Sequence, residues 1–182
     1  AVDVNENQTL IGKLKNHYYE IKAGIGLYKS PDLYGAFPTD PYSHTPGNAG
    51  VKQPGMTGQV KEDIISRMGE LGVRIFKGKV VFDTSLLNTD EFMTRDEVFN
   101  YESLSKNKAQ IKLKKDQLAF TLCQVPVIYS ISDTNAIEIE YVDGIIKKVA
   151  GNILGEKISR SIFDRRNEIA RIDVSIKKQV KI

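Results

Sequence analysis

The chain has no tryptophan, one cysteine and two histidines among its 182 residues. A single cysteine, Cys123, excludes a disulfide within the chain. Together with His17 and His44 it forms no group with the spacing of metal ligands, so we expect no metal and no cofactor. Aromatic residues make up only 8% of the composition, which argues against a dense aromatic binding surface.

The chain also has no large excess of positive or negative charge and no long apolar run. The 26 basic and 23 acidic residues leave a net charge of +3, too small to indicate a nucleic-acid partner. No apolar run approaches the roughly 20 residues that a membrane helix needs. The first residues lack the basic and apolar regions of a signal peptide, which favours a soluble protein of the cytoplasm.

Proline is scarce but concentrated. Four of the six prolines lie between residues 37 and 56, where they fix the backbone and exclude a regular element. Long connections without secondary structure usually carry function, and a stiffened one that contains aromatic residues indicates a fixed surface.

Two helical patterns enclose this loop. Apolar residues recur every three or four positions over residues 8–25 and again over 57–72, where Thr57 is a suitable N-cap. Residues 1–72 are therefore predicted to form a helix pair with a long proline-rich and aromatic loop.

From residue 73 the apolar period changes to two. A hairpin is predicted over 73–82 with Lys77 and Gly78 at its turn, followed by strands over 110–113, 118–132, 136–142 and 171–178. Cys123 falls inside the 118–132 strand pattern, where an inert buried thiol is expected. A short helix is predicted over 156–169. Because these strands follow one another through turns, residues 73–182 are predicted to be an antiparallel β-sandwich-like domain, which makes the chain α+β.

The proline-rich loop also supplies the candidate ligand-binding residues. Aromatic faces beside a carboxylate, an imidazole and hydroxyl groups suit the apolar ring faces and polar edges of a sugar. The residues concerned are Tyr34, Phe37, Asp40, Tyr42, His44 and Gln53. An equally simple interpretation is that these residues have only a structural role: the tyrosines cover the helix pair, Asp40 caps a turn and His44 forms a hydrogen bond with a loop carbonyl.

The stretch YGAFPTDPYSHTPGNAGVKQPGMTGQVKEDIISRMGELGVRI, followed by KGKVVFDTSLL, resembles the end of bacterial glycoside hydrolases and phosphorylases of the cellobiose-phosphorylase type. In that family an (α/α)6 barrel ends in a helix after a loop near the sugar site, and the chain continues into a small β-sandwich. The resemblance implies a fragment or accessory domain of a carbohydrate-active enzyme with a sugar-facing loop. The family's general acid lies earlier in its sequence, so no catalytic residue is transferred to this chain.

Two other functions stay open. In the first, the chain is a non-catalytic interaction module whose rigid loop and apolar helix faces dock a partner domain or subunit. In the second, it is an independent enzyme of another type. Neither involves nucleic acid or a membrane.

Overall fold

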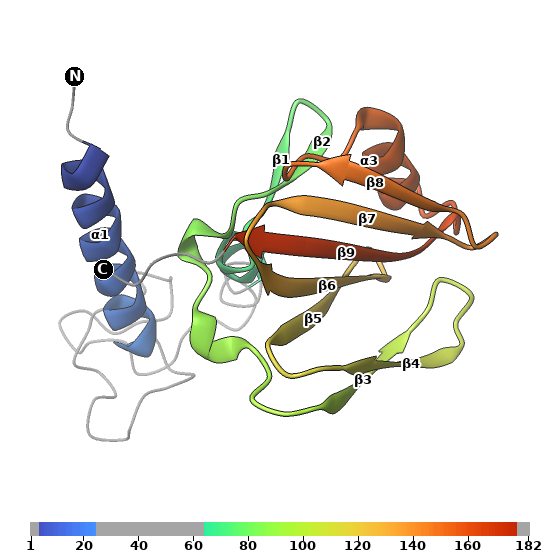
Figure 1. Cartoon of the computed structure of the whole chain (residues 1–182), viewed down its shortest axis with the longest axis horizontal. Helices are drawn as coiled ribbons and strands as arrows, with labels where there is room; N and C mark the ends of the chain where they lie inside the picture. The colour runs from blue at the N-terminus through green and yellow to red at the C-terminus, as the bar shows by residue number, and fades with distance from the viewer. Residues whose placement is uncertain (1–3, 25–63, 178–182) are drawn as a thin grey trace, which may run out of the picture. The chain divides into compact units, whose positions relative to one another are not determined.

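The computed structural model describes residues 4–24 and 64–177, with side chains described for 9–20 and 64–177. The chain divides into two compact units, residues 1–67 with Ile182, and residues 68–181. The chain is α+β, with strands predominating in the second unit (Figure 1). None of the helices in the described ranges has the length and apolar content that crossing a bilayer requires.

In the first unit, the described helix is α1, Val4–Gly24, which covers the pattern predicted over residues 8–25. Tyr18 and Tyr19 meet edge to face on this helix, with ring centroids 5.3 Å apart. Of the pattern predicted over 57–72, residues 64–72 are described: residues 64–70 are helical, and residues 71–72 form a turn, so the helix ends earlier than predicted. The proline-rich loop lies outside the described residues, so its packing and that of the helix pair stay predictions.

The second unit begins with the predicted hairpin, which is confirmed. Strands β1 (Val73–Phe76) and β2 (Lys79–Phe82) pair antiparallel, and both turn residues, Lys77 and Gly78, have positive φ. Two short 3-10 helices follow, η1 (Thr84–Leu86) and η2 (Thr89–Glu91). A second antiparallel hairpin comes next, formed by β3 (Glu97–Glu102) and β4 (Lys108–Leu113).

The remaining strands form one five-stranded sheet in the order β5-β6-β9-β7-β8 (Figure 1). They are β5 (Gln117–Leu122), β6 (Val125–Ser132), β7 (Ala136–Tyr141), β8 (Ile146–Ala150) and β9 (Ile169–Lys177). The prediction of a single strand over 118–132 is wrong at its centre: Cys123 and Gln124 form the two-residue turn between β5 and β6.

The prediction of a wholly antiparallel sheet also needs one correction, because β9 lies parallel to β6. A parallel neighbour requires a long crossover connection. The chain supplies one through β7, β8 and helix α3 (Glu156–Phe163), which is shorter than the helix predicted over 156–169. β9 then inserts between β6 and β7.

The register gives the sheet one apolar and one polar face. Ile137 pairs with Val174 and Ile139 with Ile172, and all four side chains are buried. Helix α3 and the β1–β2 hairpin complete the core on this face through residues that include Leu154, Ile158, Ile162, Val80 and Phe82. Burial of such side chains contributes about 1.5–3 kcal/mol each, so this face is the main source of stability in the unit.

Hydrogen bonds tie the hairpin to α3. The buried Ser159 hydroxyl accepts a bond from the Val80 N–H at 3.0 Å and donates to the Leu154 carbonyl at 3.4 Å. The Leu154 N–H in turn donates to the Val80 carbonyl. These bonds hold β2 at Val80, and the Phe82 N–H, which donates to the Asn152 carbonyl at 2.9 Å, holds the end of β2 where the cavity described next is found.

Candidate functional site

The predicted ligand-binding residues are not tested by the structure. Tyr34, Phe37, Asp40, Tyr42, His44 and Gln53 all lie outside the described residues. The described part of the chain contains a different candidate site, within the second unit.

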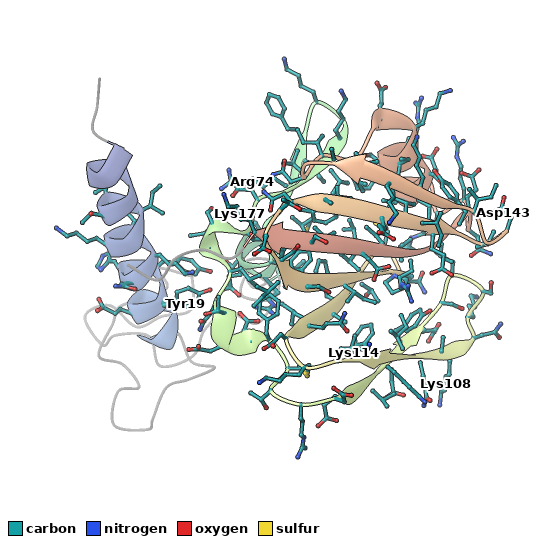
Figure 2. All side chains as sticks on the ribbon, in the orientation of Figure 1. Tyr19, Arg74, Lys108, Lys114, Asp143 and Lys177 are labelled. Atoms are coloured by element: carbon teal, nitrogen blue, oxygen red, sulfur yellow. The ribbon has the colours of Figure 1, made fainter. Side chains whose placement is uncertain are left out.

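This site is a cavity of about 230 Å³ at the ends of β2 and β9 and the start of β7, which we name the β9 cavity. The cavity is lined by one acidic residue, Asp83, by the amide side chains of Asn135 and Asn152, and by one basic residue, Lys177. Its hydroxyl groups come from Thr84, Ser85 and Ser175. Phe82, Val174 and Ile176 supply the apolar part, and all three are buried. Lys177 and the nearby Arg74 are labelled in Figure 2.

Asp83 is fixed in place by its neighbours. One carboxylate oxygen accepts a bond from the Ser85 N–H at 3.3 Å and so caps η1. The other lies 3.2 Å from the Arg74 guanidinium. The Asp83 N–H donates to the Gly72 carbonyl at 2.7 Å. The carboxylate is therefore both oriented and neutralised in charge.

Each of the two asparagines forms a hydrogen bond to the backbone through one end of its side-chain amide. Asn135 accepts the Lys177 N–H through Oδ1 at 2.8 Å, which ties the turn before β7 to the end of β9. Asn152 donates from Nδ2 to the Phe82 carbonyl at 2.9 Å. This leaves the Nδ2 group of Asn135 as a donor and the Oδ1 atom of Asn152 as an acceptor.

Three further side chains keep their polar groups free. Within the described residues, the hydroxyls of Ser85 and Ser175 and the ammonium group of Lys177 form no hydrogen bond or ion pair. The cavity therefore combines unused donors and acceptors with an apolar wall. This combination suits a small polar ligand with several hydroxyl groups.

Other reactive groups are less promising as sites. Within residues 4–24 and 64–177, no three His, Cys, Asp or Glu side chains come close enough to hold a metal ion. Cys123 is half-buried at a turn and packs beside the core, so the prediction that it is buried within a strand is wrong, and the prediction that its thiol is inert stays untested. A second hollow, near Asp90 and Arg95, is lined by exposed or half-buried charges.

Only part of the β9 cavity can be predicted from the sequence. Asn135 lies in the break between the strands predicted over 118–132 and 136–142, and the alternation over 171–178 places Ser175 and Lys177 on one face of a strand. The meeting of these groups with Asp83 and Asn152 depends on β9 inserting next to β7. That pairing joins segments far apart in the sequence and leaves no local pattern.

No protein-family model matches the chain, and no curated protein matches it significantly.

Proposed function

We propose that the chain is a fragment or accessory domain of a carbohydrate-active enzyme and that it binds sugar without catalysing a reaction itself. The resemblance to glycoside hydrolases and phosphorylases of the cellobiose-phosphorylase type motivates this proposal. In it, residues 73–182 correspond to the β-sandwich after the barrel, and the loop carrying Tyr42 and His44 faces a sugar subsite. The catalytic residues then belong to another part of the enzyme.

The observation that carries the proposal is the β9 cavity. A sugar hydroxyl both donates and accepts hydrogen bonds, and a sugar ring also has an apolar face. The free hydroxyls of Ser85 and Ser175 and the Oδ1 atom of Asn152 can hydrogen-bond the sugar hydroxyls, and the small apolar part of the cavity lining can contact the ring. At about 230 Å³ the cavity is smaller than the roughly 300–1,000 Å³ of drug-sized sites, so it suits one sugar unit.

The test is a titration of the 182-residue chain with glucose, galactose, mannose and cellobiose, followed by amide NMR shifts. We expect saturable shifts at residues around the β9 cavity. The double variant Ser85→Ala/Ser175→Ala should weaken binding about tenfold, because each lost hydrogen bond contributes about 0.5–1.5 kcal/mol. Thr121→Ala, which removes an exposed hydroxyl from β5, is the matched control and should bind normally.

The predicted loop site is tested separately with Tyr42→Ala/His44→Ala. If the loop contacts the sugar, this variant loses affinity while its melting temperature stays nearly unchanged. If no sugar shifts the residues around the β9 cavity in the unmodified chain, the cavity does not have this function.

An interaction module remains the second candidate, because one observation favours it. Leu10, Ile11 and Leu14 on α1 are 55%, 51% and 60% exposed. Apolar side chains grouped in this way mark surfaces that dock a partner. Sedimentation over a range of concentrations tests this: self-association that Leu10→Ser/Leu14→Ser abolishes would favour docking over sugar binding.

A further inference from the structure

We propose that the β9 cavity prefers a sugar that carries an anionic group, such as a carboxylate, phosphate or sulfate, over the neutral sugar. This inference rests on the proposed sugar-binding function and specifies its substrate class.

The charge balance of the cavity is the first reason. Two of its lining side chains are charged, Asp83 and Lys177. Asp83 is compensated by Arg74 at 3.2 Å and by the Ser85 N–H at 3.3 Å. Lys177 has no ion-pair partner within the described residues. The charge left for a ligand is therefore positive, and a ligand that brings a negative charge gains the attraction.

The balance of hydrogen-bonding groups is the second reason. Asn135 has used its Oδ1 atom on the Lys177 backbone, so its free end is a donor. The Lys177 ammonium group is also only a donor, and the hydroxyls of Ser85 and Ser175 can donate. Anionic oxygens accept hydrogen bonds and do not donate them, so they match this excess of donors.

The position of Lys177 decides where the anionic group would lie. Lys177 is the last residue of β9 and is exposed, whereas Val174 and Ile176 of the same strand are buried. An anionic substituent of the sugar would therefore lie at the mouth of the cavity, beside the exposed ammonium group. A charged group at the mouth keeps much of its hydration, which avoids the large cost of burying it.

The experiment compares four sugars on the full 182-residue chain, namely glucose, glucuronate, glucose 6-phosphate and glucose 6-sulfate, with inorganic phosphate as a fifth ligand. Affinity is measured by NMR titration at low and at high salt. We expect at least one of the three acidic sugars to bind about two- to fivefold tighter than glucose, with the advantage lost at high salt. Which acidic sugar binds best identifies the source of the anionic group.

Two variants assign the preference to Lys177. Lys177→Gln should bring the acidic sugars to the affinity of glucose, whereas Lys177→Arg, which keeps the charge, should retain the advantage. Lys114→Gln, at an exposed lysine elsewhere in the unit (Figure 2), should change nothing and controls for net charge.

Each contrary result has a distinct meaning. If glucose and the acidic sugars bind equally, the anionic preference is wrong and the proposed sugar binding stands. If inorganic phosphate alone binds as tightly as glucose 6-phosphate, the cavity is an anion site without a sugar preference, and the inference is also wrong. If none of the four sugars binds, both the inference and the proposed function of the cavity fail.

Discussion

Glu138 on β7 and Asp173 on β9 lie directly opposite each other in the five-stranded sheet, so two carboxylates meet on its polar face. Two cations compensate them. Lys148 on β8 lies 2.6 Å from Glu138, and Arg171 donates to Asp173 at 2.8 Å while also lying 3.3 Å from Glu140. Like charges opposite each other destabilise a sheet, so the polar face depends on these cations.

The pKa of Asp173 should make stability depend on pH. Partial burial raises this pKa, the bond and charge of Arg171 oppose the rise, and Glu140 and Glu138 add to it. As pH rises from about 4 through the raised pKa, the unfolded chain has lost a proton that the folded chain still holds, so stability falls. Asp173→Asn removes the titrating carboxyl group and with it this loss of stability. The stability of the variant relative to the unmodified chain should therefore increase with pH across that window, in urea unfolding at a series of pH values.

A matched control for this change is Asp133→Asn, at an exposed turn without a hydrogen bond among the described residues. Its stability difference from the unmodified chain is the baseline against which the pH profile of Asp173→Asn is compared. Parallel profiles for Asp173→Asn and the unmodified chain would contradict the assigned rise in pKa.

Loss of Arg171 should destabilise the sheet. Arg171→Gln leaves Glu140 and Asp173 without their shared cation, while Glu138 keeps its ion pair with Lys148. The side chains are only partly exposed, so we expect a loss of about 1 kcal/mol, reduced at high salt. Arg95→Gln removes an ion pair that is far more exposed and should cost almost nothing. Equal losses of unfolding free energy for the two variants in urea would mean that the ion pairs of Arg171 stabilise the chain no more than an exposed ion pair does.

Removal of the Tyr129 hydroxyl should destabilise the second unit. Its buried O–H donates to the Leu71 carbonyl at 2.7 Å, and its ring meets Phe82 and Phe120 edge to face. Tyr129→Phe keeps the ring contacts and leaves the carbonyl unsatisfied, which should cost about 1–3 kcal/mol. Tyr141→Phe, at a half-buried position, is the control and should cost less than half as much in thermal unfolding.

The same residue predicts a loss of stability in alkali. Burial raises the pKa of Tyr129 above its ordinary value, so the phenol stays protonated in the folded protein. Above about pH 10 the unfolded chain loses this proton and the folded chain does not, so stability falls as pH rises. Tyr129→Phe should lack this part of the alkaline loss. An unchanged alkaline profile in the variant would assign the loss to other groups.

Gly72 is predicted to be irreplaceable, whereas Gly78 is not. Both have positive φ, of 73° and 74°. A Cβ atom at Gly72 would lie 2.2 Å from the Asp83 carbonyl oxygen, whereas at Gly78 it would meet nothing within 4 Å. Gly78→Ala should therefore cost only the left-handed backbone penalty of about 1–2 kcal/mol. Gly72→Ala should cost clearly more and disturb Asp83, which urea unfolding of both variants would measure; equal losses would contradict the predicted clash.

The β1–β2 hairpin and the β5–β6 turn show what the sequence could and could not predict. Lys77-Gly78 between alternating apolar residues is a strong local signal, and the hairpin was predicted with its correct bounds. Cys123-Gln124 forms the same kind of turn without glycine or asparagine, so the local signal was missing. The β9 cavity depends on the pairing of β9 with β7 and β6, which joins distant segments and could not be predicted from periodicity.

This difference between the two turns leads to a reciprocal prediction. Gln124 has φ of 68°, a conformation that costs a side-chain-bearing residue roughly 1–2 kcal/mol, and its side chain makes only a long bond of 3.5 Å to the Ser103 carbonyl. Gln124→Gly should therefore stabilise the chain by about 0.5–1 kcal/mol after the greater freedom of glycine in the unfolded state is subtracted.

The reverse change in the other hairpin, Gly78→Gln, should destabilise the chain by about 1 kcal/mol, since Gly78 occupies the equivalent turn position with open space around it. Opposite signs for the two substitutions in the same unfolding assay would assign the effect to backbone conformation. If Gln124→Gly destabilises instead, the contact of the Gln124 side chain with the 103–107 loop outweighs the backbone strain, and this turn would be held by its tertiary contacts.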